Sequence, residues 1–138
     1  MKKVKKLYLI ATVFFGLLCG LGHLMTEFFA PKDPDVINTL KSIQLEMPGK
    51  ESDLFSLMFG ISVSLGVLLI SYGLFNLFIL RLIQFDALKM KSAIYLNLFV
   101  ILICFLIGLK FLFIAPVVLM GISFSCFVFA AALVNREK

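Results

Sequence analysis

Apolar residues gather in four long runs along the chain, and polar residues gather between them. The runs cover residues 7–29, 54–80, 93–113 and 116–134. Each run approaches or exceeds the roughly 20 residues that a helix needs to cross the hydrocarbon core of a bilayer. The connections are short, so we expect residues 1–138 to form a single membrane domain. The pattern predicts an all-α fold, an integral membrane four-helix bundle made of two helical hairpins.

The first connection carries the signals of a short helix. Asp33 supplies an N-cap and Pro34 a first helical residue. Apolar residues then recur at helical spacing, at Val36, Leu40, Ile43 and Met47. A proline–glycine pair at 48–49 follows as a stop signal. We therefore expect a short amphipathic helix over residues 34–47 in the first extracytoplasmic loop, lying either on the outer membrane face or over the mouth of the bundle.

The first apolar run has one face of small and polar residues. At 3.6 residues per turn this face contains Thr12, Gly16, Gly20, His23 and Glu27. Small residues allow another helix to approach closely. Ionisable side chains at membrane depth generally face the interior of a bundle. We expect this face to point inward, with His23 and Glu27 at its outer end.

The second apolar run has small residues on two faces. One face contains Asp53, Ser56, Gly60, Ser64 and Ser71, and the other contains Ser62, Gly66, Gly73 and Asn76. A helix with two such faces is expected to lie between two neighbours, one of them the first run. We assign a candidate ligand-binding site to five residues near the outer ends of the first two runs, namely His23, Glu27, Asp53, Ser56 and Gly60.

Tyrosine and asparagine side chains cluster near the cytoplasmic ends of the second and third runs. They are Tyr72, Asn76, Tyr95 and Asn97. Hydrogen bonds between helices and anchoring at the membrane interface account for these residues without any substrate.

Charged residues are few, and their distribution predicts an orientation. Of the 138 residues, 62% are hydrophobic and 15% are charged, which excludes an ordinary soluble globular protein. Basic residues lie before the first run, between the second and third, and after the fourth, whereas acidic residues concentrate around the first connection. The positive-inside rule therefore places both termini in the cytoplasm. Basic residues so dispersed do not form a nucleic-acid-binding face, and we expect no nucleic acid partner.

The single histidine and its neighbouring acid are the chief candidates for chemistry. His23 and Glu27 could exchange a proton, orient an amine-bearing ligand or supply two metal ligands. A structural alternative is also open, in which His23 is a hydrogen-bonded core residue and Glu27 is hydrated. Zinc takes three or four protein ligands, and the chain has no second histidine and no paired cysteines. We predict no metal centre and no cofactor, and we assign no catalytic residue.

Two phrases of the sequence resemble a known group of proteins. The first is Gly20-Leu21-Gly22-His23, and the second comprises residues 58–66 and 71–74. Together they are similar to small four-span bacterial membrane proteins with a Gly-x-x-His element in the first helix. DoxX-like proteins are a looser comparison. The resemblance implies a four-helix fold in a bacterial inner membrane, and it carries no established activity.

Three functions stay open from the sequence. The first is a non-enzymatic protein that binds a membrane lipid or small amphiphile near His23 and Glu27, or that serves as a partner in a homo-oligomer or a larger membrane complex. The second is a small proton-coupled transporter that uses the same pair. The third is a membrane enzyme acting on a lipid or quinone, with His23 as acid and base.

Overall fold

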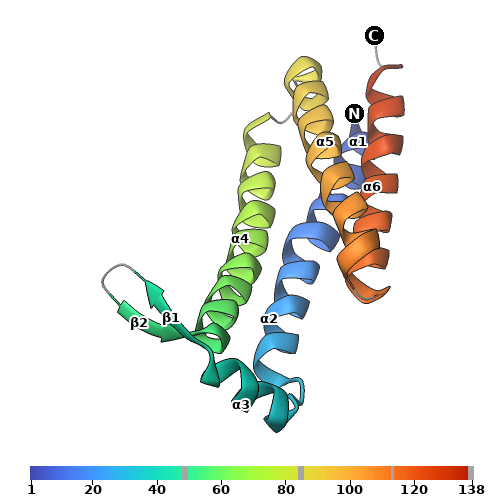
Figure 1. The fold of residues 1–138 in the computed structure, drawn as a ribbon. Helices are drawn as coiled ribbons and strands as arrows, with labels where there is room; N and C mark the ends of the chain where they lie inside the picture. The colour runs from blue at the N-terminus through green and yellow to red at the C-terminus, as the bar shows by residue number, and fades with distance from the viewer. Residues whose placement is uncertain (48–49, 84–85, 113, 137–138) are drawn as a thin grey trace.

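The computed structural model describes residues 1–47, 50–83, 86–112 and 114–136. Over these residues the chain forms five helices and one two-stranded hairpin (Figure 1). Four of the helices are long and apolar enough to cross a membrane, namely Lys2–Phe29, Leu54–Ile83, Ala87–Lys110 and Ile114–Val134. The predicted all-α class is confirmed, with the small hairpin as an addition.

The first long helix changes its packing partner halfway along its length. It consists of α1 (Lys2–Thr12), a π-helical segment η1 (Val13–Leu18) and α2 (Cys19–Phe29). Helix α1 packs against α6 (Ile114–Val134), whereas α2 packs against α4 (Leu54–Ile83), and η1 contacts both. A π-helical turn contains extra backbone and rotates the residues that follow it. The segment therefore lies where one helix passes from one neighbour to the other.

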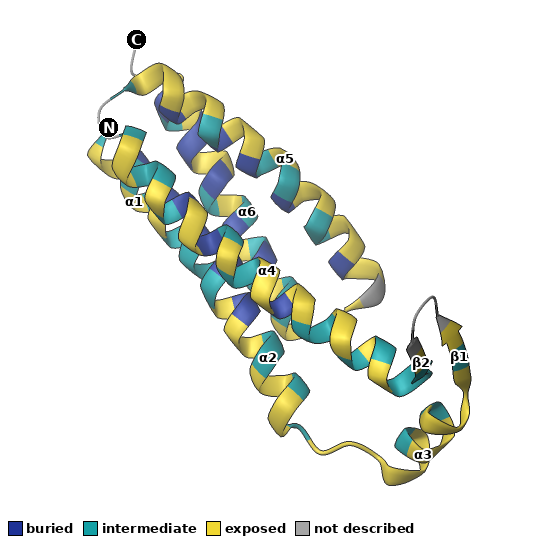
Figure 2. Ribbon diagram, turned by 90° about the vertical axis from the view of Figure 1, so that its left-hand side faces the viewer, coloured by how far each residue is buried: buried dark blue, intermediate teal, exposed yellow. Residues whose placement is uncertain are grey.

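The four long helices form two hairpins, and the first helix contacts both of them. Helix α4 packs against α2 in one hairpin, and α5 (Ala87–Phe111) packs against α6 in the other. The contact between α1 and α6 joins the hairpins, while α4 and α5 barely touch. The buried apolar core comes from α1, η1, α2, α5 and α6. The buried residues of α4 among those described are Gly66, Gly73 and Asn76, and Figure 2 shows the rest of the helix as exposed or half-buried.

The helices extend beyond several of the predicted spans. The first begins at Lys2 rather than at residue 7, and α5 begins at Ala87 rather than at residue 93. Lysine has a high helix propensity, so a helix continues past the end of an apolar run. The carboxylate of Asp86 caps α5 by accepting a hydrogen bond from the Lys89 amide at 3.0 Å. Helix α6 begins at Ile114, before the predicted residue 116.

The predicted amphipathic helix over residues 34–47 is wrong in its second half. Helix α3 covers only Pro34–Ser42, with Asp33 as its N-cap as predicted. Ile43 is extended, and β1 (Gln44–Met47) pairs antiparallel with β2 (Lys50–Asp53). The helical spacing hid a second pattern, because residues 43–47 also alternate apolar and polar with the period of a strand. A proline–glycine pair after such a run is a turn signal as well as a helix stop.

Buried polar side chains link three helices at the end of the bundle that carries the chain termini. Tyr8 on α1 donates a hydrogen bond to Asn76 Oδ1 at 2.5 Å and accepts one from Asn97 Nδ2 at 3.0 Å. Tyr72 in turn donates to Asn97 Oδ1. The predicted bonding of Tyr72, Asn76 and Asn97 between helices is confirmed, while the role of Tyr8 was missed. Tyr95 lies apart from this network, on an exposed face.

Glycines bring α4 into close contact with the first long helix. A Cβ atom on Gly16 would lie 2.4 Å from Gly73 Cα, and one on Gly20 would lie 3.0 Å from the Gly66 carbonyl oxygen. These separations leave no space for a side chain. The glycine face of the first run therefore points inward, as predicted, and it meets the Gly66 and Gly73 face of α4.

The other small-residue face of α4 has no such neighbour. Its exposed members are Ser56, Gly60, Ser64 and Ser71. A Cβ atom on Gly60 would meet nothing within 4 Å. The expectation that both faces of the second run contact other spans is therefore met on one face only.

Replacing Gly16 or Gly60 by alanine should have opposite effects on stability. Gly16→Ala forces the two backbones apart, and overpacking of this kind costs about 1–3 kcal/mol. Gly60→Ala meets open space, and alanine favours a helix by about 1 kcal/mol over glycine. We expect Gly16→Ala to lower and Gly60→Ala to preserve or raise the midpoint of thermal unfolding in detergent, followed by circular dichroism. Equal midpoints would contradict the glycine contact.

Candidate functional site

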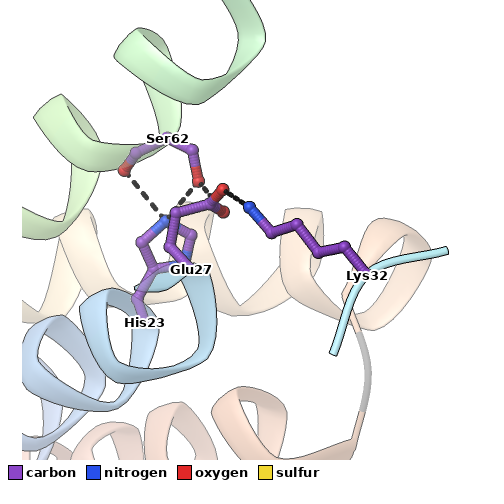
Figure 3. Close-up of polar contacts among 4 residues, drawn as sticks. All are labelled: His23, Glu27, Lys32 and Ser62. Atoms are coloured by element: carbon purple, nitrogen blue, oxygen red, sulfur yellow. Dashed lines mark hydrogen bonds and ion pairs between the residues drawn. The ribbon is translucent and has the colours of Figure 1, made fainter. Parts of the chain in front are cut away.

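His23 and Glu27 lie one turn apart on α2 and both reach Ser62 on α4 (Figure 3). The His23 Nε2 atom is 2.9 Å from the Ser62 carbonyl oxygen and 2.9 Å from the Ser62 hydroxyl oxygen. The Ser62 hydroxyl donates to Glu27 Oε2 at 2.8 Å. The close approach of α2 to α4 at Gly20 and Gly66 places these three side chains together.

The partners of His23 fix the hydrogen on one ring nitrogen. A carbonyl oxygen can only accept, and the Ser62 hydroxyl hydrogen is donated to Glu27. Both contacts therefore require a hydrogen on His23 Nε2. The ring belongs to a chain of hydrogen bonds that runs from His23 through Ser62 to the carboxylate of Glu27.

Lys32 completes this cluster, and sequence reasoning missed it. Its Nζ atom lies 2.5 Å from Glu27 Oε1, so each carboxylate oxygen of Glu27 has a partner. Lys32 follows the end of α2 in the short segment 30–33, which leads into α3. The connection must turn back toward α4 within a few residues, and this geometry brings Lys32 over the carboxylate. A lysine five residues beyond an acid is not an intrahelical pair, so helical spacing gave no signal.

A cavity of about 380 Å³ opens beside this ion pair, and we name it the loop cavity. It is lined by the last turn of α2, by the segment 30–33 with α3, and by the first turns of α4. These elements meet at the end of the bundle away from the termini, which we call the loop end (Figure 1). Its charged and hydroxyl groups come from Glu27, Lys32, Asp33 and Ser62. The remaining lining is apolar and comes from Val36, Ile37, Leu40, Phe55, Met58 and Phe59. The apolar side chains of α3 therefore face the same cavity as the Glu27–Lys32 ion pair.

A second cavity of about 320 Å³, the bundle cavity, lies deeper between the long helices. It is lined by η1, α2, α4, α5 and α6, where α4 and α5 have few contacts. Its lining is mostly apolar, with polar side chains from His23 and Thr26 and sulfur atoms from Cys19, Cys104 and Met120. Residues of α4 between 55 and 62 line the loop cavity, and Leu65 and Leu69, one to two turns further along the helix, line the bundle cavity. The His23–Ser62 contact stands between the two cavities.

The structure does not bring the other predicted site residues to this cluster. Asp53 caps α4, because its carboxylate accepts hydrogen bonds from the Ser56 amide and the Ser56 hydroxyl, each at 2.8 Å. These bonds hold the pKa of Asp53 below its usual value. Ser56 and Gly60 line a separate open groove on the exposed face of α4. Ligand binding by Asp53, Ser56 or Gly60 stays a prediction.

The donor set of the cluster is also relevant to metal binding. Within residues 1–47, 50–83, 86–112 and 114–136, no group of three or more His, Cys, Asp or Glu side chains is placed to hold a metal ion. His23 and Glu27 supply two such side chains, and their bound neighbours are a hydroxyl and an ammonium group.

No protein-family model, curated protein or solved structure matches the chain. The resemblance to four-span bacterial proteins stays a prediction.

Removing the Ser62 hydroxyl should loosen α2 from α4. Ser62→Ala deletes the hydroxyl bonds to His23 and to Glu27 but keeps the bond from His23 to the backbone carbonyl of residue 62. Hydrogen bonds between membrane helices contribute about 1 kcal/mol. Ser64→Ala is the matched control, because the exposed Ser64 hydroxyl donates to the Gly60 carbonyl of its own helix. We expect a lower unfolding midpoint for Ser62→Ala alone. Two identical midpoints would show that the cluster adds nothing to the helix contact.

Proposed function

We propose that this chain is a multi-pass membrane protein that binds a membrane lipid or small amphiphile, without catalysis, at the outer end of its first two spans. The observation that supports the proposal is the pair of neighbouring cavities, with Ser62 lining one, His23 lining the other and the His23–Ser62 contact between them. One cavity has charged groups and the other is mostly apolar, so together they complement a molecule with a polar end and a hydrocarbon part.

The proposal divides recognition between the cavities. The polar end of the ligand interacts with Glu27 and Ser62 in the loop cavity, beneath the apolar face of α3. The hydrocarbon part occupies the bundle cavity, where Gly22 leaves space beside His23. Helix α3 limits access from the water phase, because it forms one wall of the loop cavity.

We also propose an orientation in a bacterial inner membrane. The two termini lie at one end of the bundle, and α3 and the hairpin lie at the other (Figure 1). The basic residues in the first turns of α1 and after α6 belong to the end with the termini, whereas acidic residues gather around α3 and the hairpin. The positive-inside rule therefore favours cytoplasmic termini and an outer loop.

Thiol labelling of intact cells tests this orientation. Glu51→Cys places a thiol on an exposed residue of β2, and Asn135→Cys places one near the C-terminus. The native cysteines are buried or half-buried within the long helices, so they give little background. A membrane-impermeant maleimide should label only Glu51→Cys until the cells are opened. Labelling of Asn135→Cys in intact cells would reverse the proposed orientation.

Native mass spectrometry of gently extracted protein tests the binding function. We expect a retained lipid or amphiphile that His23→Ala and Glu27→Ala release. Gly22→Leu should also release it, because the added side chain fills the bundle cavity without meeting an atom within 4 Å of its Cβ position. Glu51→Ala is the control acid, since Glu51 is exposed on β2 and lines neither cavity. Unchanged retention in all three site variants would refute the proposal.

A proton-coupled carrier is the second candidate, and the continuous hydrogen bonds from His23 to Glu27 favour it. Such a chain can pass a proton between an imidazole and a carboxylate. Substrate-dependent proton flux into proteoliposomes, lost in Glu27→Gln, would support the carrier over simple binding. The enzyme hypothesis stays a prediction from the sequence alone.

A further inference from the structure

The loop cavity already surrounds a cation. Lys32 Nζ lies 2.5 Å from Glu27 Oε1, 5.0 Å from the centroid of the Phe59 ring and 5.6 Å from that of Phe55. A carboxylate together with aromatic rings at these distances is a favourable environment for an ammonium group. The cavity therefore contains a cation site whose occupant is a side chain of the same protein.

The groups that form this site are held in place without Lys32. Glu27 is bonded to Ser62 through its other carboxylate oxygen at 2.8 Å. Phe55 and Phe59 lie one turn apart on α4, with their rings stacked at 6.1 Å between centroids. Lys32 instead comes from the segment between α2 and α3, and its side chain is 32% exposed against 19% for Glu27. Rotation of the lysine side chain would vacate a site that stays formed.

Charge then selects what can replace the lysine. The charged residues that line the loop cavity are Glu27, Lys32 and Asp33. Lys41 on α3 also lies near, with its Nζ 5.5 Å from the Phe55 centroid. Without the Lys32 ammonium, the described residues that line the cavity keep two acids, and Lys41 is the nearby base, beside Phe55. An anionic group would be repelled there, whereas a cation with an apolar part would match both the acids and the apolar walls.

We propose that the loop cavity binds the ammonium head of an amphiphile, a primary amine or a quaternary ammonium, which displaces Lys32. This inference rests on the proposed function and names the chemistry of its ligand. Lys32 acts as an internal competitor, and a tethered group of this kind competes at an effective concentration on the order of millimolar. The wild-type protein therefore binds an external cation more weakly than the bare site would.

Titration of the full chain with charged amphiphiles tests this inference. Protein purified in dodecyl maltoside is titrated with dodecyltrimethylammonium or with dodecyl phosphate, and complexes are counted by native mass spectrometry. Lys32→Gln should bind the cation about tenfold more tightly than wild type, because the competitor is gone. Glu27→Gln and Phe59→Leu should bind it several-fold more weakly. Lys89→Gln is the matched control, since Lys89 pairs with Asp86 at 3.2 Å and lies outside the cavity.

The outcomes separate this inference from the proposed function. Weaker binding of the cation by Lys32→Gln, or tighter binding of the phosphate than of the cation by wild type, overturns the ammonium assignment. If His23→Ala releases a retained lipid but Lys32→Gln gains no affinity for the cation, the inference fails while the binding function stands. If wild type and Lys32→Gln retain no amphiphile of any charge, both fail.

Two sources of the ammonium head are distinguished by parallel samples of Lys32→Gln. One sample is assembled in nanodiscs that contain phosphatidylethanolamine, and the other is mixed with dodecylamine in detergent. Preferential retention of phosphatidylethanolamine supports a lipid headgroup as the ligand. Binding of dodecylamine without retention of the phospholipid supports a free amphiphilic amine.

Discussion

The close contact between the first long helix and α4 determines most of this structure. At Gly16 and Gly73 the two backbones touch, and no side chain fits between them. Helix α4 has little other buried surface, since it barely contacts α5. Because this contact is made by backbone, it fixes the rotation of both helices about their axes. The positions of His23, Glu27 and Ser62 follow from that rotation.

The π-helical segment makes this contact compatible with a second one. Helix α1 is part of the apolar core with α5 and α6, whereas α2 belongs with α4. One straight α-helix presents each face in a constant direction, so it would not serve both neighbours equally well. The extra backbone of η1 rotates α2 relative to α1. Helices α4 and α5 have few contacts with each other, and the bundle cavity lies between the two hairpins there.

The polar cluster shows how a charged group is accommodated beside apolar helices. Glu27 has a hydroxyl partner on one carboxylate oxygen and an ammonium partner on the other. These partners come from α4 and from the connection to α3, so the carboxylate links three parts of the chain. Aromatic rings beside the Lys32 ammonium complete its surroundings. Glu27 is only half-buried, so these partners stabilise its charge together with the water that still reaches it.

The sequence alone determined the long helices, the inward glycine face and the N-cap at Asp33, because these depend on local composition and helical period. Only the tertiary structure decided which partners His23 and Glu27 have. Ser62 lies 39 residues from His23 in the chain, and no local pattern encodes that separation. Residues 43–47 fit both a helix and a strand by their apolar spacing, and pairing with β2 selected the strand. Lys32 joined the site because the connection folds back, which depends on contacts distant in the sequence.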